Sequence, residues 1–511
     1  MAKIFLSRRQ ALATGAAASA ILAAPSLSRA QSRPMMAHGI MSGDVAHDSA
    51  MIWAHADREA RMLVEWATTE SLADATRMPA LNVSPATGSA GKFLLNGLPS
   101  DQDIFYRVRM EDLSDPSAVS EPLTGRFRTA PTGLRDIRFV WSGDTAGQGW
   151  GIDRDRGGMR TYATMLEHRP DFMIHSGDTV YADGPLEEEV ALADGSTWRN
   201  LVTPAKRKVA ETLDEFRGQH LYNYLDENVR AFNAEVPILA QWDDHEVTNN
   251  WYPAEILEDE RYTEKNVALL AARGARAFHE MLPTRQTPEE PGRVYRKVGY
   301  GPLLDIFFLD MRSYRGDNSP NRQEEGAPFL GAEQLAWLKR ELTGSRATWK
   351  VIASDMPIGM MVRDGETDFE NMANGDGPPL GRERDIAEIL SFIRAADVGN
   401  TVWLTADVHY TAAHHYSPDR AQFQDFEPFW EFVSGPLHSG TFGPSEYDNT
   451  FGPEVRFAKH PEEGQANLPP SEGLQFFGLV EIDAASREMT VRLMDSGDTE
   501  LWSTKLAPRM T

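Results

Sequence analysis

Six apolar segments of the chain end in ionisable side chains. Each segment has the length and β-rich composition of a buried strand, and the ionisable residues follow directly after it. In FMIHSGDTVYADG, for example, the apolar run stops at His175, and Asp178, Tyr181 and Asp183 come next. The terminal residues of the six segments are Asp144; Asp178; Asp243, Asp244, His245 and Glu246; Asp310 and Arg312; Asp355; and Asp407 and His409.

This pattern predicts a metal site. The carboxyl ends of strands in an open α/β sheet lie at one edge, where ligands bind. If the six segments share a sheet, their carboxylates converge there, and cations remove the repulsion between them. A single Asp after a strand is more often a helix N-cap or a turn residue. Six such ends in series, two of them with a histidine, favour more than one bound ion.

The elements that would position these residues indicate an α/β domain over residues 135–511. Apolar runs alternate there with helical stretches. In one stretch, EQLAWLKREL, Leu335, Leu338 and Leu342 share a helical face, and Gly344 follows as a stop signal. The last segment, from residue 474 onward, has the pattern of hairpin strands that complete a sheet. Asp183 and Asp243 are interpreted as structural rather than ligating.

Residues 34–131 have an all-β pattern. Short segments with alternating or β-rich character, such as RMLVEWATT and DIFYRVRMED, are separated by turn residues. The spacing is typical of a small sandwich of the fibronectin or immunoglobulin type. Catalytic side chains do not gather in this part of the sequence, so we interpret it as a packing domain.

Residues 1–30 have the features of an export signal. Arg8 and Arg9 form a twin-arginine pair, an alanine-rich apolar stretch follows, and a small-residue cleavage signal ends at Ala30. The apolar stretch is short and is broken by Pro25, which argues against a permanent membrane span. The sequence therefore predicts transport by the Tat machinery and a periplasmic or secreted location.

Composition excludes several classes of function. The chain has 511 residues and a net charge of −25, which is poorly suited to non-specific binding of nucleic acid phosphates, and we expect no specific nucleic-acid partner. It contains no cysteine, so disulfides, iron–sulfur clusters and a thiol nucleophile are excluded. An anionic substrate remains compatible with the acidic chain, because a metal or a local Arg can reverse the potential inside a cleft.

The motifs at these strand ends resemble those of PhoD-type alkaline phosphatases, a branch of the metallophosphoesterase superfamily. The matching blocks are SGDTAGQGWG, HSGDTVYADG, WDDHEVTNNW, LDMRSYR, GAEQLAWL, LTADVHY and SGPLHSGTFGP, and they occur in the family's order. The segment HGIMSGDVAHDSAMIWAHA resembles the β domain that precedes the family's catalytic domain. The resemblance implies a sandwich of β-sheets flanked by helices, with two or more metals that serve phosphate-ester hydrolysis.

The resemblance also implies two metal sites that share Asp178 as a bridging ligand. The first would use Asp144, Tyr181 and His409, with the phenol supplying a donor where Ala146 stands in place of the superfamily's histidine. The other ligands of the second site would be Asp244, Asp355 and Asp407.

The chemistry of these ligands bears on the choice of metals. Hard oxygen ligands suit Ca²⁺, Mg²⁺ or Mn²⁺ better than Zn²⁺. The ordinary pKa of tyrosine is near 10, so ionising a tyrosine requires a strong cation. The family implies Fe³⁺ and Ca²⁺, with Mn²⁺, Mg²⁺ or Zn²⁺ as alternatives.

Two residues are candidates for catalysis. His245 follows the ligand Asp244, as the superfamily's proton-donating histidine follows its ligand, and is the predicted general acid. Arg312 is the candidate for stabilising charge on the phosphoryl oxygens, and a structural salt bridge to Asp310 is the alternative.

The predicted function is metal-dependent hydrolysis of phosphate mono- or diesters by a metal-activated hydroxide. A phospholipase D-like diesterase is one alternative. A non-catalytic protein that binds metal or phosphate is the other, although pure binding needs no proton donor.

Overall fold

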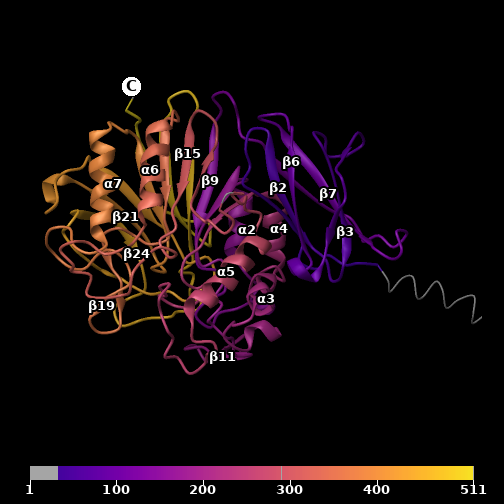
Figure 1. Cartoon of the computed structure of the whole chain (residues 1–511), viewed down its shortest axis with the longest axis horizontal. Helices are drawn as coiled ribbons and strands as arrows, with labels where there is room; N and C mark the ends of the chain where they lie inside the picture. Colours follow the sequence, from indigo (N-terminus) through magenta and orange to yellow (C-terminus); the bar gives the residue numbers. More distant parts are fainter. Residues whose placement is uncertain (1–32, 289, 510–511) are drawn as a thin grey trace, which may run out of the picture.

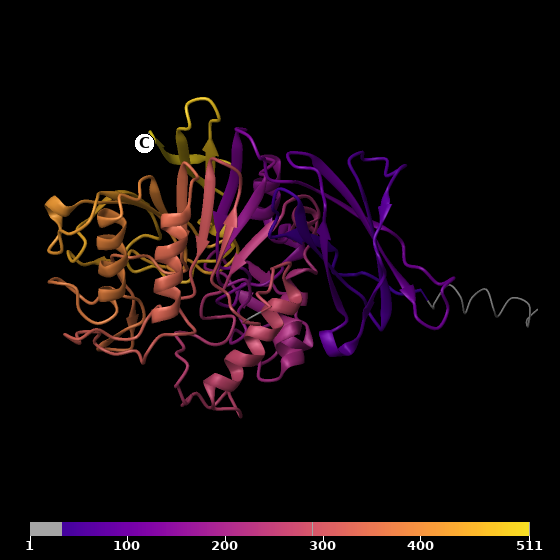
Figure 2. The same cartoon turned by 45° about the horizontal axis from the view of Figure 1, so that its top comes forward.

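Two large β-sheets lie face to face at the centre of the molecule, and helices cover both outer faces (Figures 1 and 2). The computed structural model describes residues 33–288 and 290–509. The predicted export signal, residues 1–30, lies outside this described part. Within it, no helix is long and apolar enough to cross a membrane.

The first sheet has nine strands and contains three of the six predicted segments. Its strands β9, β10 and β13 are parallel neighbours, and they precede Asp144, Asp178 and Asp243 respectively. The C-terminal strands β25, β26 and β27 form the predicted hairpins and extend one side of the sheet. In spatial order the strands are β27 (Glu500–Leu506), β26 (Met489–Asp495), β25 (Phe476–Ile482), β9 (Ile137–Ser142), β10 (Phe172–Ser176), β13 (Ile238–Gln241), β1 (Ile40–Gly43), β2 (Ser49–His55) and β6 (Ala90–Asn96).

The second sheet has seven strands and contains the other three segments. Strands β15, β16 and β20 run parallel and precede Asp310, Asp355 and Asp407. The six segments therefore divide between two sheets instead of sharing one. In spatial order the strands are β14 (Arg296–Gly299), β15 (Leu304–Phe308), β16 (Trp349–Ala353), β20 (Thr401–Thr405), β22 (Phe429–Val433), β21 (Thr411–Tyr416) and β24 (Pro453–Lys459).

Apolar clusters hold the layers together. One cluster fills the space between the sheets, with Phe139 from the first sheet and Ile306 from the second. Helices α2, α3, α4 and α5 pack on the outer face of the first sheet, and α6 and α7 on that of the second. The predicted helix is confirmed as α6, with its three leucines buried. The helices are α2 (Arg160–Glu167), α3 (Leu213–Asn223), α4 (Glu227–Glu235), α5 (Val267–Met281), α6 (Ala332–Gly344) and α7 (Glu383–Ala395).

The N-terminal part is all-β, as predicted. Strands β1, β2 and β6 face a smaller sheet across their own apolar core. The smaller sheet contains β4 (Thr76–Arg77), β3 (Ala60–Ala67), β7 (Asp103–Asp112) and β8 (Leu123–Arg128), with β5 (Leu81–Val83) paired to β3. Because β1 also pairs with β13, this part continues the nine-stranded sheet. An ion pair of 2.7 Å between Asp44 and Arg296 adds to the connection. The predicted boundaries of the N-terminal domain, 34–131, stay a prediction.

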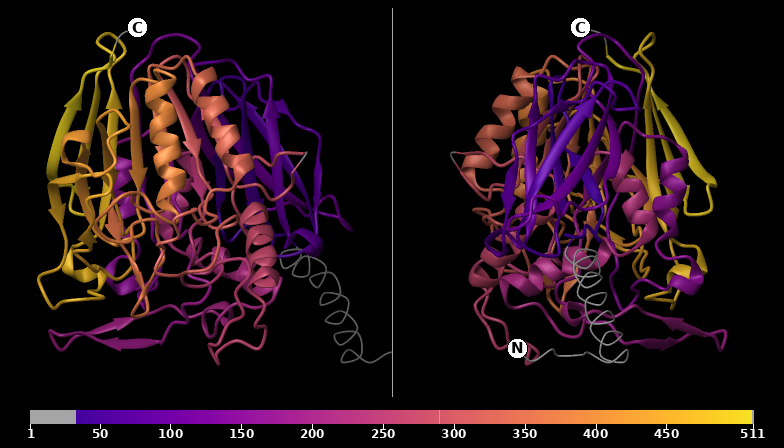
Figure 3. Two further views of the ribbon diagram at one scale, coloured as in Figure 1. Left: turned by 60° about the vertical axis from the view of Figure 1, so that its left-hand side comes forward. Right: turned by 90° about the vertical axis from the view of Figure 1, so that its right-hand side faces the viewer.

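Short two-stranded pairs complete the described elements. They are β11 (Glu189–Ala191) with β12 (Thr197–Arg199), β17 (Met360–Met361) with β23 (Glu446–Tyr447), and β18 (Arg363–Asp364) with β19 (Asp368–Phe369). The hairpin β11–β12 extends away from the body of the molecule (Figure 3). The loop after β19 brings Glu370 towards the carboxyl ends of the central strands.

A buried carboxyl group at the start of α7 gives a testable pH dependence. Burial and the neighbouring Asp448 raise the pKa of Glu383 to about 9. The folded protein therefore binds more protons than the unfolded chain above pH 4.5, and stability falls as pH rises towards 9, by at most about 1.4 kcal/mol per pH unit. The Glu383→Gln variant keeps the acceptor for Leu380 N–H. We expect its melting temperature to exceed the parent's at pH 9 and to change less with pH; equal slopes in both proteins would contradict this.

Candidate metal centre and active site

Loops from both sheets meet at the carboxyl ends of the central strands. Asp144 follows β9 and Asp178 follows β10, and the amide of Thr145 donates to the carbonyl of Asp178 at 2.9 Å. His409 follows β20 in the other sheet. Ligand atoms of Asp144, Asp178 and His409 nevertheless lie within 4.8 Å of one another. The fold therefore assembles three predicted ligands of the first site from two different sheets.

Four predicted ligands have left-handed backbone conformations. The φ angles are 67° at Asp144, 50° at Asp178, 67° at Asp407 and 60° at His409. Non-glycine residues adopt this region at an energetic cost, and such residues cluster at ligand and active sites. These left-handed residues turn the chain sharply at the ends of buried strands. The turns keep the four side chains near the strand ends, whereas an extended backbone would carry them away.

Hydrogen bonds orient the histidine and the phenol of the first group. The Nδ1 atom of His409 lies 2.5 Å from the carbonyl oxygen of Gly440, which fixes Nδ1 as the protonated nitrogen. Its Nε2 atom is then an acceptor, and the hydroxyl of Tyr181 lies 2.9 Å from it. Tyr181 is 1% exposed. An imidazole nitrogen and a phenol oxygen are thus directed to the same point as the carboxylates of this group, which is the usual arrangement around a bound metal.

A second group shares Asp178 with the first. Ligand atoms of Asp178, Asp244 and His245 lie within 4.8 Å of one another. The backbone amide of His245 donates to Asp178 at 3.2 Å, and that of Asn250 donates to Asp244 at 2.6 Å. Asp178 is therefore placed between the two groups, as a bridging ligand must be.

A third group includes a residue that the sequence did not single out. Asp243, Glu370 and Asp407 bring ligand atoms within 4.8 Å of one another. Glu370 follows the short strand β19 in an irregular loop, without the apolar run that marks the six strand ends. Asp243, interpreted from sequence as structural, also belongs to this group.

The carboxylates of the centre fit a bound cation. Both side-chain oxygens of Asp144 and of Asp355, and one oxygen of Asp407, are buried without a hydrogen-bond partner among the described residues. Burial and the nearby carboxylates raise the pKa values of Asp144, Asp178 and Asp407 well above the usual range. Buried oxygens without donors are rare in native proteins, and a cation would satisfy them while cancelling the repulsion.

Arg312 supplies one fixed positive charge next to these carboxylates. It is fully buried, its Nε donates to Asp243 at 2.8 Å, and its guanidinium also pairs with Glu370. Asp355, a predicted ligand outside the three groups, lies 3.4 Å from the same Nε. The alternative partner Asp310 accepts from the backbone amide of Arg312, at 3.1 Å. The catalytic role of Arg312 stays a prediction, as does the ligand role of Asp355.

His245 is held by a carboxylate that sequence reasoning left out of the site. Its Nδ1 lies 2.7 Å from Asp183 Oδ1, and the amide of Asn249 donates to the other oxygen of Asp183 at 2.9 Å. The ring packs on Tyr181 with centroids 4.3 Å apart. Burial opposes the charged ring, but Asp183 and Asp244 outweigh it and raise the pKa of His245 to about 10. The geometry suits a protonated histidine whose Nε2 is free to donate.

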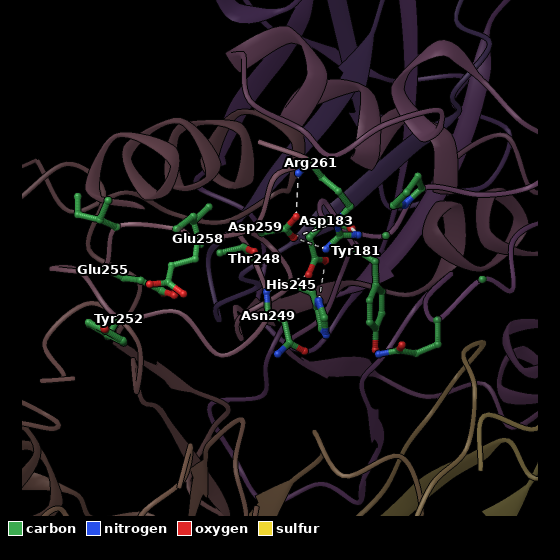
Figure 4. Close-up of a pocket in the computed structure, with 16 residues that line it drawn as sticks. Tyr181, Asp183, His245, Thr248, Asn249, Tyr252, Glu255, Glu258, Asp259 and Arg261 are labelled. Carbon is green, nitrogen blue, oxygen red and sulfur yellow. Dashed lines mark hydrogen bonds and ion pairs between the residues drawn. The ribbon is translucent and has the colours of Figure 1, made fainter. Parts of the chain in front are cut away.

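Two cavities meet at His245. One, of about 330 Å³, lies over the carboxylates and is lined by Asp178, Asp244 and His409. The other, of about 820 Å³, extends from Tyr181 and Asp183 to Tyr252 and the acidic segment after it (Figure 4). Gln148, His245 and Asn249 line both. An ester bound over the carboxylates would therefore have His245 at its side and a larger space beyond.

Comparisons with known proteins identify the family of this chain. The profile of the PhoD-like phosphatase family matches residues 139–493, and that of the PhoD-like phosphatase N-terminal domain matches residues 20–131. Alkaline phosphatase D of Bacillus subtilis (strain 168) is 27% identical over 436 residues, which cover 81% of this chain and 71% of the relative.

Solved structures show the same fold. The structure of PhoD aligns with a TM-score of 0.68 and 21% identity, over 93% of this chain and 90% of the other. A purple acid phosphatase, PPD1 from yellow lupin, aligns with a TM-score of 0.55 and 12% identity, over 93% of this chain and 74% of the other. The predicted sandwich of sheets flanked by helices is confirmed. Since the family profile spans most of the sequence, this chain belongs to the PhoD-like phosphatase family and is a phosphoesterase hydrolase.

Proposed function

We propose that this chain is an exported, metal-dependent phosphatase that hydrolyses phosphate mono- or diesters. The observation that carries the proposal is the meeting of Asp144, Asp178, Tyr181 and His409 at one point, with His245 at the edge of the same cavity. Export is supported by the twin arginines Arg8 and Arg9, and it places the enzyme in the periplasm or outside the cell.

Asp144, Asp178, Tyr181 and His409 would hold the first ion, and Asp178, Asp244, Asp355 and Asp407 the second. The donor sets favour Fe³⁺ in the first position and Ca²⁺ in the second, because a phenolate needs a strong cation and carboxylates alone suit a hard divalent ion. Bound metals of this kind activate water and neutralise charge on phosphoryl oxygens.

The chain's own residues perform the remaining steps. Asp183 accepts a hydrogen bond from Nδ1–H of His245 and keeps the ring in one orientation. The Nε2 proton then faces the cavity and passes to the oxygen of the leaving alcohol as the phosphorus–oxygen bond breaks. Arg312 pairs with Asp243 and Glu370 and holds the acidic groups in place.

Hydrolysis of p-nitrophenyl phosphate and bis-p-nitrophenyl phosphate tests the proposal directly. Protein isolated with its native metals should release nitrophenol from at least one ester, and a chelator should abolish the release. Absence of hydrolysis of both esters by protein of verified metal content would contradict the proposed function. The relative rates would establish the preference between monoesters and diesters.

Tyr181 offers a spectroscopic test of the iron assignment. A phenolate bound to ferric iron gives a visible charge-transfer band, so we expect the native protein to be coloured and the Tyr181→Phe variant to lose the band. Tyr222 is the matched control, because its phenol is also buried but accepts a hydrogen bond from Ile152 at 2.8 Å, away from the centre. The Tyr222→Phe variant should keep the colour. An active, colourless and iron-free preparation would refute the assignment.

A further inference from the structure

Gln148 has a backbone conformation that glutamine seldom adopts. Its φ angle is 60°, in the left-handed region, and it follows Asp144 and Ala146, whose φ angles are 67° and 64°. Asparagine and aspartate enter this region most easily, because their short side chains can hydrogen-bond locally. A longer side chain held in this conformation costs stability, and such residues cluster at active sites and ligand clamps. The strain raises the question of what the glutamine side chain provides that glycine would not.

Contacts on two sides hold the backbone of Gln148 in place. On one side, Asn467 Nδ2 donates to the carbonyl oxygen of Gln148 at 3.1 Å, and Asn467 Oδ1 accepts from Trp150 Nε1 at 3.0 Å. On the other side, Gly147 lies directly against the ring of Tyr181, where an added Cβ atom would be 2.3 Å from two ring carbons. The strained residue is therefore fixed beside the predicted ligand Tyr181.

The side-chain amide of Gln148 is free to bind another molecule. The side chain is half-buried, and its oxygen and nitrogen make no hydrogen bond among the residues that the structure describes. Two neighbouring amides differ in this respect. Asn467 uses both of its amide atoms, and Asn200 accepts from the amide of Gly151 at 2.7 Å and donates to the carbonyl of Gly149 at 3.0 Å. The Gln148 amide thus keeps its N–H donors and its acceptor available.

Gln148 lies where the two cavities of the active site meet. It lines the cavity of about 330 Å³ over the carboxylates and the larger one of about 820 Å³, and His245 and Asn249 are the other residues that line both. An ester bound with its phosphoryl group over the carboxylates has its reacting phosphorus–oxygen bond at this junction. In the proposed mechanism His245 serves the leaving oxygen, so a second N–H donor at the junction is placed for the phosphoryl oxygens.

We propose that Gln148 is a catalytic residue whose side-chain N–H donates a hydrogen bond to a phosphoryl oxygen of the bound ester. The inference rests on the proposed phosphatase function and adds a substrate-contacting residue to it. A neutral donor suits this position, because Asp178, Asp244 and Asp407 already line the same cavity and a further carboxylate would repel the phosphoryl oxygens. One hydrogen bond to a charged group is strong enough to change a rate constant by roughly 10–100-fold.

Two variants remove the amide with different effects on the backbone. Gln148→Met keeps the size of the side chain and the strained conformation, whereas Gln148→Gly adopts a φ angle of 60° without strain. We expect both to lose roughly 10–100-fold in kcat/KM for p-nitrophenyl phosphate while they keep the metal content of the parent. The melting temperature of Gln148→Gly should be no lower than the parent's, because relief of strain opposes the greater freedom of glycine in the unfolded chain.

The dependence on the leaving group distinguishes a phosphoryl contact from other roles. Every ester presents the same phosphoryl oxygens, so the loss should be equal for p-nitrophenyl phosphate and for ethyl phosphate. A loss confined to ethyl phosphate would place the amide at the leaving oxygen and overturn the assignment. Inorganic phosphate presents these oxygens without any leaving group, so its inhibition constant should rise in both variants.

Arg487 provides the matched control. Its φ angle is also 60°, but it lies in the turn between β25 and β26 and lines neither cavity. Arg487→Gly should relieve the same kind of strain and keep the kinetics of the parent. If the parent hydrolyses neither p-nitrophenyl ester, the proposed function and this inference fail together. If the parent is active and either Gln148 variant keeps its kcat/KM, or loses it only together with bound metal, this inference alone is overturned.

Discussion

The His245→Gln variant is expected to lose about 10²–10⁴-fold in kcat for alkyl phosphates, the range that positioned general acids contribute. The reason is geometric: Asp183 Oδ1 lies 2.7 Å from Nδ1 of His245, and His245 lines both cavities. An alkoxide is a poor leaving group and needs a proton, whereas nitrophenolate is stable without one. The loss should therefore be large for alkyl esters and small for p-nitrophenyl esters, as measured by parallel steady-state kinetics.

Metal content distinguishes this role from a ligand role. His245 also belongs to a group with Asp178 and Asp244, and its Nε2 lies 3.9 Å from Asp244. If His245 acts as the proton donor, the His245→Gln variant binds the same metals in the same ratio as the parent. Loss of one ion together with equal rate losses for both kinds of ester would identify it as a ligand instead.

The strand ends were predictable because the signal is local. An apolar run that stops at an ionisable residue is visible in the sequence, and Asp144, Asp178 and His409 do lie together in the structure. The assignment of strands to sheets is not local, because β10 and β20 present equivalent patterns but pair with different neighbours. The sequence could therefore predict that the ligands converge, but not that they converge from two facing sheets.

Residues outside this pattern were missed for identifiable reasons. Glu370 follows no buried strand, and it reaches the centre only because the loop after β19 folds inward onto Arg312. Asp183 was interpreted as structural, and its partner His245 lies 62 positions away. Arg312, predicted from sequence to contact the substrate, is fully buried and paired with Asp243, and its catalytic role stays a prediction. Contacts that form only in the tertiary structure produce no recognisable pattern in the local sequence.

Asp178 should have the largest effect on metal binding, because it belongs to two of the three ligand groups. The Asp178→Asn variant removes the carboxylate that we propose bridges the two ions, so we expect both ions to be lost together. The loss of metal affinity should exceed the roughly 10–100-fold loss typical when a residue that only hydrogen-bonds to a ligand is removed. Hydrolysis should fall to the level of the chelator-treated parent. Elemental analysis by mass spectrometry and ester hydrolysis measure the two effects, and retention of one ion in full would argue against a bridging role.

Stability gives the decisive second measurement. Burial and Asp244 raise the pKa of Asp178 well above its usual range, which shows that its charged form is unfavourable in the metal-free protein. In chelator, the melting temperature of Asp178→Asn should therefore be no lower than that of the parent. Added metal stabilises the parent by about 2.7 kcal/mol at a concentration of 100 Kd, and this gain should vanish in the variant. Asp448→Asn, a buried control outside the three ligand groups, should keep both the metals and the gain. If Asp178 only binds metal, replacing it should not destabilise the metal-free protein. An Asp178→Asn variant that unfolds in chelator would therefore show that Asp178 stabilises the fold itself.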